Sequence, residues 1–188
     1  MRIVKPWAYI FPVTFVVLLY ANLILFFKTD AGGGDGLFWA AVVFGIINCV
    51  CAFAFCKSGN EKFLRNFVMI LKYGIVPFFL IYFWMALGFT TLFTFLIGFL
   101  SLGIAGIMAV IDYLILLVGT CYMLSYLILR IKNGRISPVK GILHGICQFI
   151  FVLDVLDTMY LFAIKEKKGR IAAVLTLLAA AAIIFTIL

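Results

Sequence analysis

The sequence contains few charged residues. Only 12% of its 188 residues are Asp, Glu, Lys or Arg, whereas an ordinary globular domain has about 25%. Apolar residues make up 67% of the chain and aromatic residues 17%. A soluble domain of this length would leave much of that apolar material on its surface, where contiguous apolar patches drive aggregation. The composition therefore excludes a water-soluble globule and predicts that lipid surrounds the protein.

The residues and motifs of most enzyme classes are missing. The single histidine excludes the multi-histidine zinc sites and the His-Glu-x-x-His helix, and a metal site built from His144, Asp154 and Asp157 would be unusual. No Gly-x-Ser-x-Gly nucleophile elbow occurs. We therefore expect no catalytic residues, no metal and no cofactor. One enzymatic alternative stays open, in which Asp112 meets Asp154 or Asp157 across helices as the carboxylate pair of an intramembrane protease.

The five cysteines form neither a Cys-x-x-Cys pair nor a disulfide framework. All of them lie in apolar stretches, so we expect them to pack between helices as small apolar side chains.

The net charge of +8 does not indicate nucleic acid as a partner. The cations occur in short clusters between apolar runs, and no extended basic helix is available to follow a phosphate backbone. Clusters placed in this way are typical of membrane topology signals and lipid headgroup contacts.

The apolar runs predict an all-α, polytopic bundle of transmembrane helices, with residues 1–188 forming a single membrane-embedded domain. A spanning helix needs about 20 apolar residues, because lipid offers no partner to unpaired backbone groups. We expect five or six spans plus a possible short re-entrant or interfacial helix. The candidate segments are 7–27, 37–56, 67–88, 107–129, 141–164 and 171–188.

Two segments can each be arranged in the membrane in more than one way. The run 89–131 is apolar apart from Asp112 and is about twice as long as one crossing requires. We expect 91–106 to be a short or re-entrant piece before the span 107–129, although two full spans are the alternative. The segment 141–164 either spans, as its length favours, or lies as a shallow helix at the cytoplasmic interface.

The positive-inside rule gives an orientation. It places Arg2 and Lys5, the 57–66 loop and the 130–140 loop in the cytoplasm, so we expect a cytoplasmic N-terminus. The basic segment 165–170 conflicts with this rule if 141–164 spans, because six spans would carry that segment outside.

Ionisable and amide side chains inside the apolar runs are the candidates for a polar path or a ligand site. A carboxylate in the bilayer costs about 2.5 to 3.5 kcal/mol by insertion scales, so a retained one usually faces a bundle interior or a partner. Two explanations stay open for each residue: a permeation or proton path, and a structural role in contact with water, headgroups or neighbouring helices. The candidates are Asp112, His144, Gln148, Asp154, Asp157 and Asn48. On a helix over 141–164, His144, Gln148 and Asp154 would share one face, with Asp157 just beyond it, so we expect them to form a polar stripe.

Small residues recur every four positions at Ser101, Ala105 and Ala109, near the middle of the chain. Small side chains at this spacing let helix backbones approach each other closely, within one chain or between subunits. The predicted helix-packing residues are Gly98, Ser101, Ala105, Gly106 and Ala109.

Two stretches carry a resemblance. Residues 135–161, RISPVKGILHGICQFIFVLDVLDTMYL, and 109–128, AVIDYLILLVGTCYMLSYLI, resemble small uncharacterised multi-pass membrane proteins of Gram-positive bacteria. The resemblance implies that the protein resides in a bacterial plasma membrane, but it does not imply any activity. The final segment 171–188 lies outside it.

From these features we expect a channel, carrier or transporter subunit that acts as a homo-oligomer in the lipid bilayer. The alternative is a non-catalytic accessory, immunity or scaffold protein that binds another membrane protein.

Overall fold

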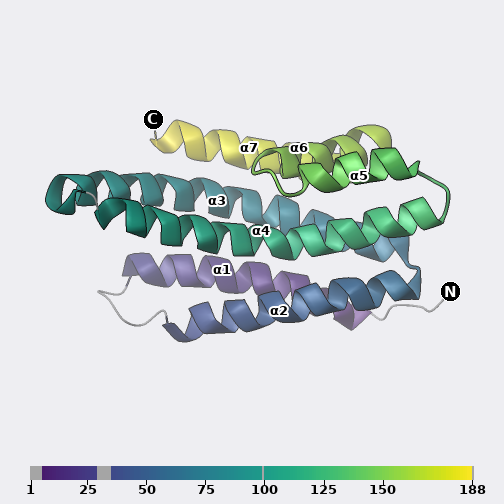
Figure 1. Ribbon diagram of the computed structural model, residues 1–188, viewed down its shortest axis with the longest axis horizontal. Helices are drawn as coiled ribbons and strands as arrows, with labels where there is room; N and C mark the ends of the chain where they lie inside the picture. The colour runs from purple at the N-terminus through teal and green to yellow at the C-terminus, as the bar shows by residue number, and fades with distance from the viewer. Residues whose placement is uncertain (1–5, 29–34, 99, 188) are drawn as a thin grey trace.

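The computed structural model describes residues 6–28, 35–98 and 100–187, which are helical almost throughout (Figure 1). No strand occurs within these ranges, so the predicted all-α class is confirmed. The elements are the 3-10 helix η1 (Pro6–Tyr9), α1 (Ile10–Lys28), α2 (Asp35–Ser58), α3 (Glu61–Ile97), α4 (Leu100–Lys132), α5 (Pro138–Cys147), α6 (Leu153–Met159), the π-helix η2 (Tyr160–Lys165) and α7 (Arg170–Ile187).

The long helices α3 and α4 form the centre of the bundle. Figure 1 shows them as an antiparallel pair, with α1 and α2 on one side and α5, α6 and α7 on the other. The helices α1 to α4 are each long and apolar enough to cross a membrane, and α7 is a shorter apolar helix. The five cysteines are half-buried free thiols.

The bundle has an apolar exterior and polar groups inside. Phe95, Ile171 and Phe185 are 88%, 79% and 87% exposed, whereas Asn48 and Gln148 are fully buried. Water-soluble proteins rarely combine a broadly apolar surface with buried amides. This distribution is the one expected of a helix bundle in lipid, where polar groups find their partners in the interior.

A single turn divides the long apolar run 89–131. The helix α3 continues to Ile97, and Gly98, with φ +58°, donates its backbone N–H to Thr94 O at 3.1 Å. The next helix begins at Leu100. Residues 91–106 are therefore the tip of the α3–α4 hairpin. The prediction of a separate short or re-entrant piece there is wrong, because the excess length belongs to two helices of 37 and 33 residues.

The predicted single helix over 141–164 is also wrong. The chain leaves helical geometry after Cys147 and resumes it at Leu153. In Figure 1, α6 runs back beside α5 towards the end of the bundle at which α5 begins. A limb of ten residues rises only about 15 Å, half of what a crossing needs. The segment is thus a helical hairpin packed on α3 and α4 and does not form one continuous spanning helix.

The hairpin brings the basic segments to one end of the bundle. The α2–α3 turn, the α4–α5 connection and the 165–170 segment share that end, while the α3–α4 turn lies at the other (Figure 1). The conflict over 165–170 therefore disappears, because the chain returns to the end from which it entered. Arg2 and Lys5, used in the orientation argument, lie outside the described residues.

Candidate functional site

A buried ion pair joins the hairpin to the central helices. The Lys72 ammonium on α3 contacts Oδ2 of Asp154 in the first turn of α6, and the two side chains are only 2% and 6% exposed. Each charge alone would lose several kcal/mol of hydration on burial, so the pair depends on mutual neutralisation. The Thr158 hydroxyl donates to Asp154 O at 2.7 Å, one turn further along.

A second polar group links the two limbs of the hairpin. Nδ1 of His144 on α5 lies 2.5 Å from Oδ1 of Asp157 on α6. Gln148 Nε2 donates to the other oxygen of Asp157 at 2.7 Å and to His144 O at 3.1 Å. The His144 ring also stacks on Tyr160, with ring centroids 6.4 Å apart. Both limbs are therefore held through a single carboxylate.

The tip of the hairpin also contacts α4. The Thr120 hydroxyl donates to Gln148 O at 3.0 Å, which satisfies a carbonyl at the break in the helix. Gly119 gives the Lys72 stem room to pass along α4, since a Cβ there would lie 3.3 Å from Lys72 Cε. The absence of a side chain at 119 thus helps to place the ammonium beside Asp154.

The turn between the limbs is strained. Val152 has φ +69° and ψ −49°, and Leu153 N–H donates to Phe151 O at 2.8 Å. This is a γ-turn of the rare positive-φ kind, in a region that β-branched residues seldom occupy. Such a conformation costs on the order of 1–3 kcal/mol and persists only where surrounding contacts hold it. The ion pair at Asp154, two residues later, is one such contact.

The site lies deep in the bundle. Lys72 is about 16 Å along α3 from its first residue, and Thr120 is about 18 Å from the last residue of α4. Both helices have these ends on the basic side of the bundle (Figure 1). The hairpin tip therefore packs well inside the bundle, three turns or more from these helix ends.

Four predicted site residues come together here, but not as the expected stripe on one helix. His144 and Gln148 belong to one limb and Asp154 and Asp157 to the other. Asp112 lies eight residues before Thr120 on α4, about 12 Å along the helix axis towards the opposite end. Its Oδ1 is buried without a hydrogen-bond partner among the described residues.

Sequence reasoning missed Lys72 and Thr120. The available signal for Lys72 was its position inside the predicted span 67–88, where a charged residue is as costly as Asp112 is in its own span. Thr120 gave no comparable signal, because a threonine inside a helix can bond its own backbone.

Asn48 lies outside this site. Its Nδ2 donates to Phe44 O at 2.8 Å and to Phe11 O at 3.1 Å, and Tyr122 OH donates to its Oδ1 at 3.1 Å. These bonds tie α1, α2 and α4 together, which is the contact expected of a polar residue between helices.

The small residues lie near the α3–α4 turn. Gly98 forms the turn itself, and Ser101 is buried, with its hydroxyl accepting from Thr94 at 2.9 Å. Ala105 is half-buried, while Gly106 and Ala109 are exposed. A Cβ at Gly106 would meet no atom within 4 Å, so no described helix of this chain packs on that face.

The described part of the chain contains no group of three or more His, Cys, Asp or Glu side chains that could hold a metal ion.

Comparison with known proteins identifies the family. The sequence model of a family of unknown function, DUF6652, matches residues 4–169, so the chain belongs to this family. The matched range contains α1 to α6 and η2, including the whole hairpin, and ends just before α7. No curated protein and no solved structure matches the chain significantly.

Proposed function

We propose that this protein is a membrane transport protein, either a carrier or a channel subunit, whose polar site is the hairpin tip against α3 and α4. The observation that carries the proposal is the Lys72–Asp154 pair, buried in the interior of the bundle beside the break between α5 and α6. Non-helical backbone at membrane depth is tolerated only inside protein or along a cavity. Carriers use broken helices and buried ionisable residues of this kind to bind substrates and ions.

The proposed topology has five crossings, made by α1 to α4 and α7, with the α5–α6 hairpin entering and leaving through the cytoplasmic face. The positive-inside rule supports this orientation, because the basic segments around 57–66, 130–140 and 165–170 share one end. It gives a cytoplasmic N-terminus. With 18 residues, α7 rises about 27 Å, close to the thickness of the hydrocarbon core. The resemblance described above supports a bacterial plasma membrane.

The proposed transport mechanism depends on the ion pair. While Lys72 and Asp154 are paired as in this structure, they neutralise each other, so neither charge is available to a solute. Protonation of the Asp154 carboxylate, or a cation that replaces Lys72 as its partner, removes this attraction and lets the strained turn at Val152 relax. Occupation of the site and movement of the hairpin are thereby coupled.

Association into a homo-oligomer is part of the proposal. Gly106 and Ala109 are exposed on α4, and the Gly106 position is open to close approach by another helix. Small residues on a lipid-facing helix allow backbones of two subunits to pack closely.

Flux measurements in liposomes test the transport proposal. The native chain, Asp154→Asn and the matched carboxylate control Asp112→Asn would be reconstituted at equal density, and entry of protons, Na⁺ and K⁺ would be followed with ion-sensitive dyes. We expect flux of at least one ion with the native chain, a loss of tenfold or more with Asp154→Asn, and a change within about twofold with Asp112→Asn. Absence of flux of all three ions with the native chain would rule out the proposal of ion transport.

A second function has support from a different feature. In Figure 1 the α3–α4 tip extends beyond the ends of α1, α2 and α7, and Phe95 and Leu96 near it are 88% and 71% exposed. A projecting apolar tip suits an accessory protein that binds another membrane protein. A photo-crosslinker at position 95 tests this role in cells. Adducts with a distinct membrane protein support it, whereas adducts of two copies, or none, count against it.

A further inference from the structure

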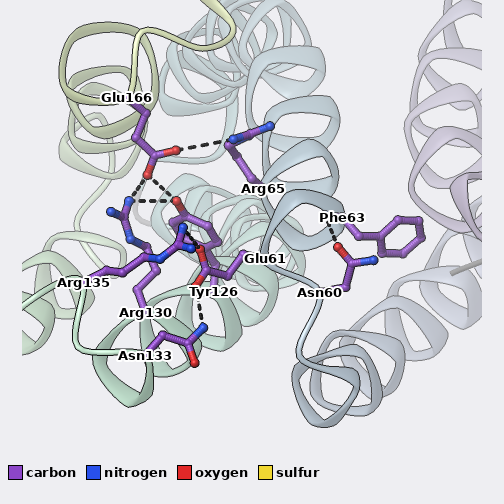
Figure 2. Close-up of polar contacts among 9 residues, drawn as sticks. All are labelled: Asn60, Glu61, Phe63, Arg65, Tyr126, Arg130, Asn133, Arg135 and Glu166. Atoms are coloured by element: carbon purple, nitrogen blue, oxygen red, sulfur yellow. Dashed lines mark hydrogen bonds and ion pairs between the residues drawn. The ribbon is translucent and has the colours of Figure 1, made fainter. Parts of the chain in front are cut away.

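Two arginines share one carboxylate at the basic end of the bundle (Figure 2). Arg130 Nη1 and Tyr126 OH, both on α4, contact the same oxygen of Glu166, which follows η2. Arg65 on α3 lies on the other side, with Nη1 3.6 Å from the second oxygen. The Arg130 guanidinium also lies over the Tyr126 ring, 5.6 Å from its centroid.

This cluster has more donors than acceptors. The Nε atoms of Arg65 and Arg130 are buried and have no hydrogen-bond partner among the described residues. The 3.6 Å contact is too long for a hydrogen bond, so Glu166 holds Arg65 by charge alone. A guanidinium carries five N–H donors in a planar fork. Arg65 is therefore equipped to bind a second anion.

No other acidic residue at this end is free to supply that anion within the described chain. Glu61 accepts from Asn133 at 2.6 Å and from Arg135 at 2.9 Å. The cations around the cluster are exposed and outnumber both acids. They are Lys57, Lys62, Lys132, Arg135, Lys140, Lys165, Lys167, Lys168 and Arg170.

The depth of the cluster matches lipid headgroups. Arg65 lies one turn after the start of α3, and Arg130 lies in the last turn of α4. In a helix that crosses a bilayer, such positions lie at the headgroup level outside the hydrocarbon core. Clustered Lys and Arg residues at that level attract anionic phospholipids.

We infer that this end of the protein binds the phosphate group of an anionic phospholipid, with Arg65 as its principal ligand and Glu166 as an internal competitor. Phosphate oxygens fit the guanidinium fork in bidentate geometry, which an ammonium does not offer. The surrounding exposed cations favour a lipid, whose headgroup lies in the same layer, over a phosphate free in solution. The inference is independent of any transport activity.

Native mass spectrometry of the full chain in detergent tests the inference. Phosphatidylglycerol and phosphatidylcholine would be titrated separately, and the matched variants Arg65→Gln and Lys140→Gln each remove one charge at the same end. We expect phosphatidylglycerol to bind at least tenfold more tightly than phosphatidylcholine. Arg65→Gln weakens phosphatidylglycerol binding about tenfold, as expected for loss of a charge-assisted bond, while Lys140→Gln changes it by at most about twofold.

Removing Glu166, which competes with the lipid for Arg65, should have the opposite effect on lipid affinity. Glu166→Gln removes the internal carboxylate, so we expect phosphatidylglycerol to bind several-fold more tightly, while Glu61→Gln leaves its affinity within about twofold. Circular dichroism verifies that each variant is folded. If Arg65→Gln does not fold, Arg65→Lys replaces it, because it keeps the charge and loses the fork, and it is expected to weaken binding several-fold.

Three results overturn the inference. Equal binding of the two lipids removes the preference for an anionic headgroup. Equal losses in Arg65→Gln and Lys140→Gln mean that charge spread over the surface, and not Arg65, attracts the lipid. Displacement of phosphatidylglycerol by an equal concentration of inorganic phosphate means that the site takes free anions.

Discussion

The Lys72 ammonium on α3 contacts the Asp154 carboxylate, 82 positions further along the chain. This contact fixes the start of α6 against a helix at the centre of the bundle. It connects the strained turn at Val152, the break between α5 and α6, and the long helices into one unit. Much of what distinguishes this fold from a simple bundle of spanning helices depends on it.

Removing one partner of this pair should destabilise the protein strongly. Lys72→Met leaves the buried Asp154 carboxylate unpaired, so the free energy of unfolding should fall by about 3–5 kcal/mol. Unfolding by sodium dodecyl sulfate, followed by circular dichroism, measures the loss. The double variant Lys72→Met with Asp154→Leu should recover most of it, because an apolar pair replaces the ion pair. Equal losses in the single and double variants would contradict the prediction.

Relief of strain at the hairpin turn should stabilise the protein. Val152→Gly places a residue that tolerates positive φ at the γ-turn, and the free energy of unfolding should rise by about 1 kcal/mol. Val139→Gly, at an exposed position of α5, serves as the control and should lower it by about 0.5–1 kcal/mol. The same unfolding assay applies. A loss at both positions would mean that the Val152 side chain contributes more than its strain costs.

Two glycines should respond to alanine in opposite directions. Gly169 has φ +69°, and a Cβ there would lie 2.4 Å from Met69 Sδ, so Gly169→Ala should lower the unfolding free energy by about 1–3 kcal/mol. Gly106 lies inside α4 with open space beside it. Gly106→Ala should therefore raise the unfolding free energy of a single chain by about 0.5–1 kcal/mol. A loss at 106 would instead indicate that a second subunit packs there.

The fold-back of the hairpin can be tested by labelling single cysteines from each side of the membrane. Cysteines introduced at Asn133 and Lys167 should react with a membrane-impermeant thiol reagent from the same side, because the hairpin returns to the end from which it enters. A cysteine at Phe95, near the α3–α4 turn, is the control and should react from the opposite side. Labelling of 133 and 167 from opposite sides would show that residues 141–164 cross the membrane.

Most of the candidate site was visible in the sequence, but its geometry was not. Four of its residues, His144, Gln148, Asp154 and Asp157, were predicted from their cost in an apolar segment. Placing them on one continuous helix made them a stripe. The fold-back instead divides them between two contacts. Asp157 meets His144 and Gln148 from the opposite limb, and Asp154 meets Lys72 on another helix.

The sequence alone determined that the chain is helical, because runs this apolar can satisfy their backbone groups in lipid only by coiling. It also determined which residues carry a burial cost. Only the tertiary structure decided that 141–164 turns back between Cys147 and Leu153 and that the run 89–131 turns at Gly98. The physical reason is that apolar length is the same for a span and for a hairpin. The groups that hold the turn, Lys72 and Thr120, come from helices distant in sequence, where no local pattern records them.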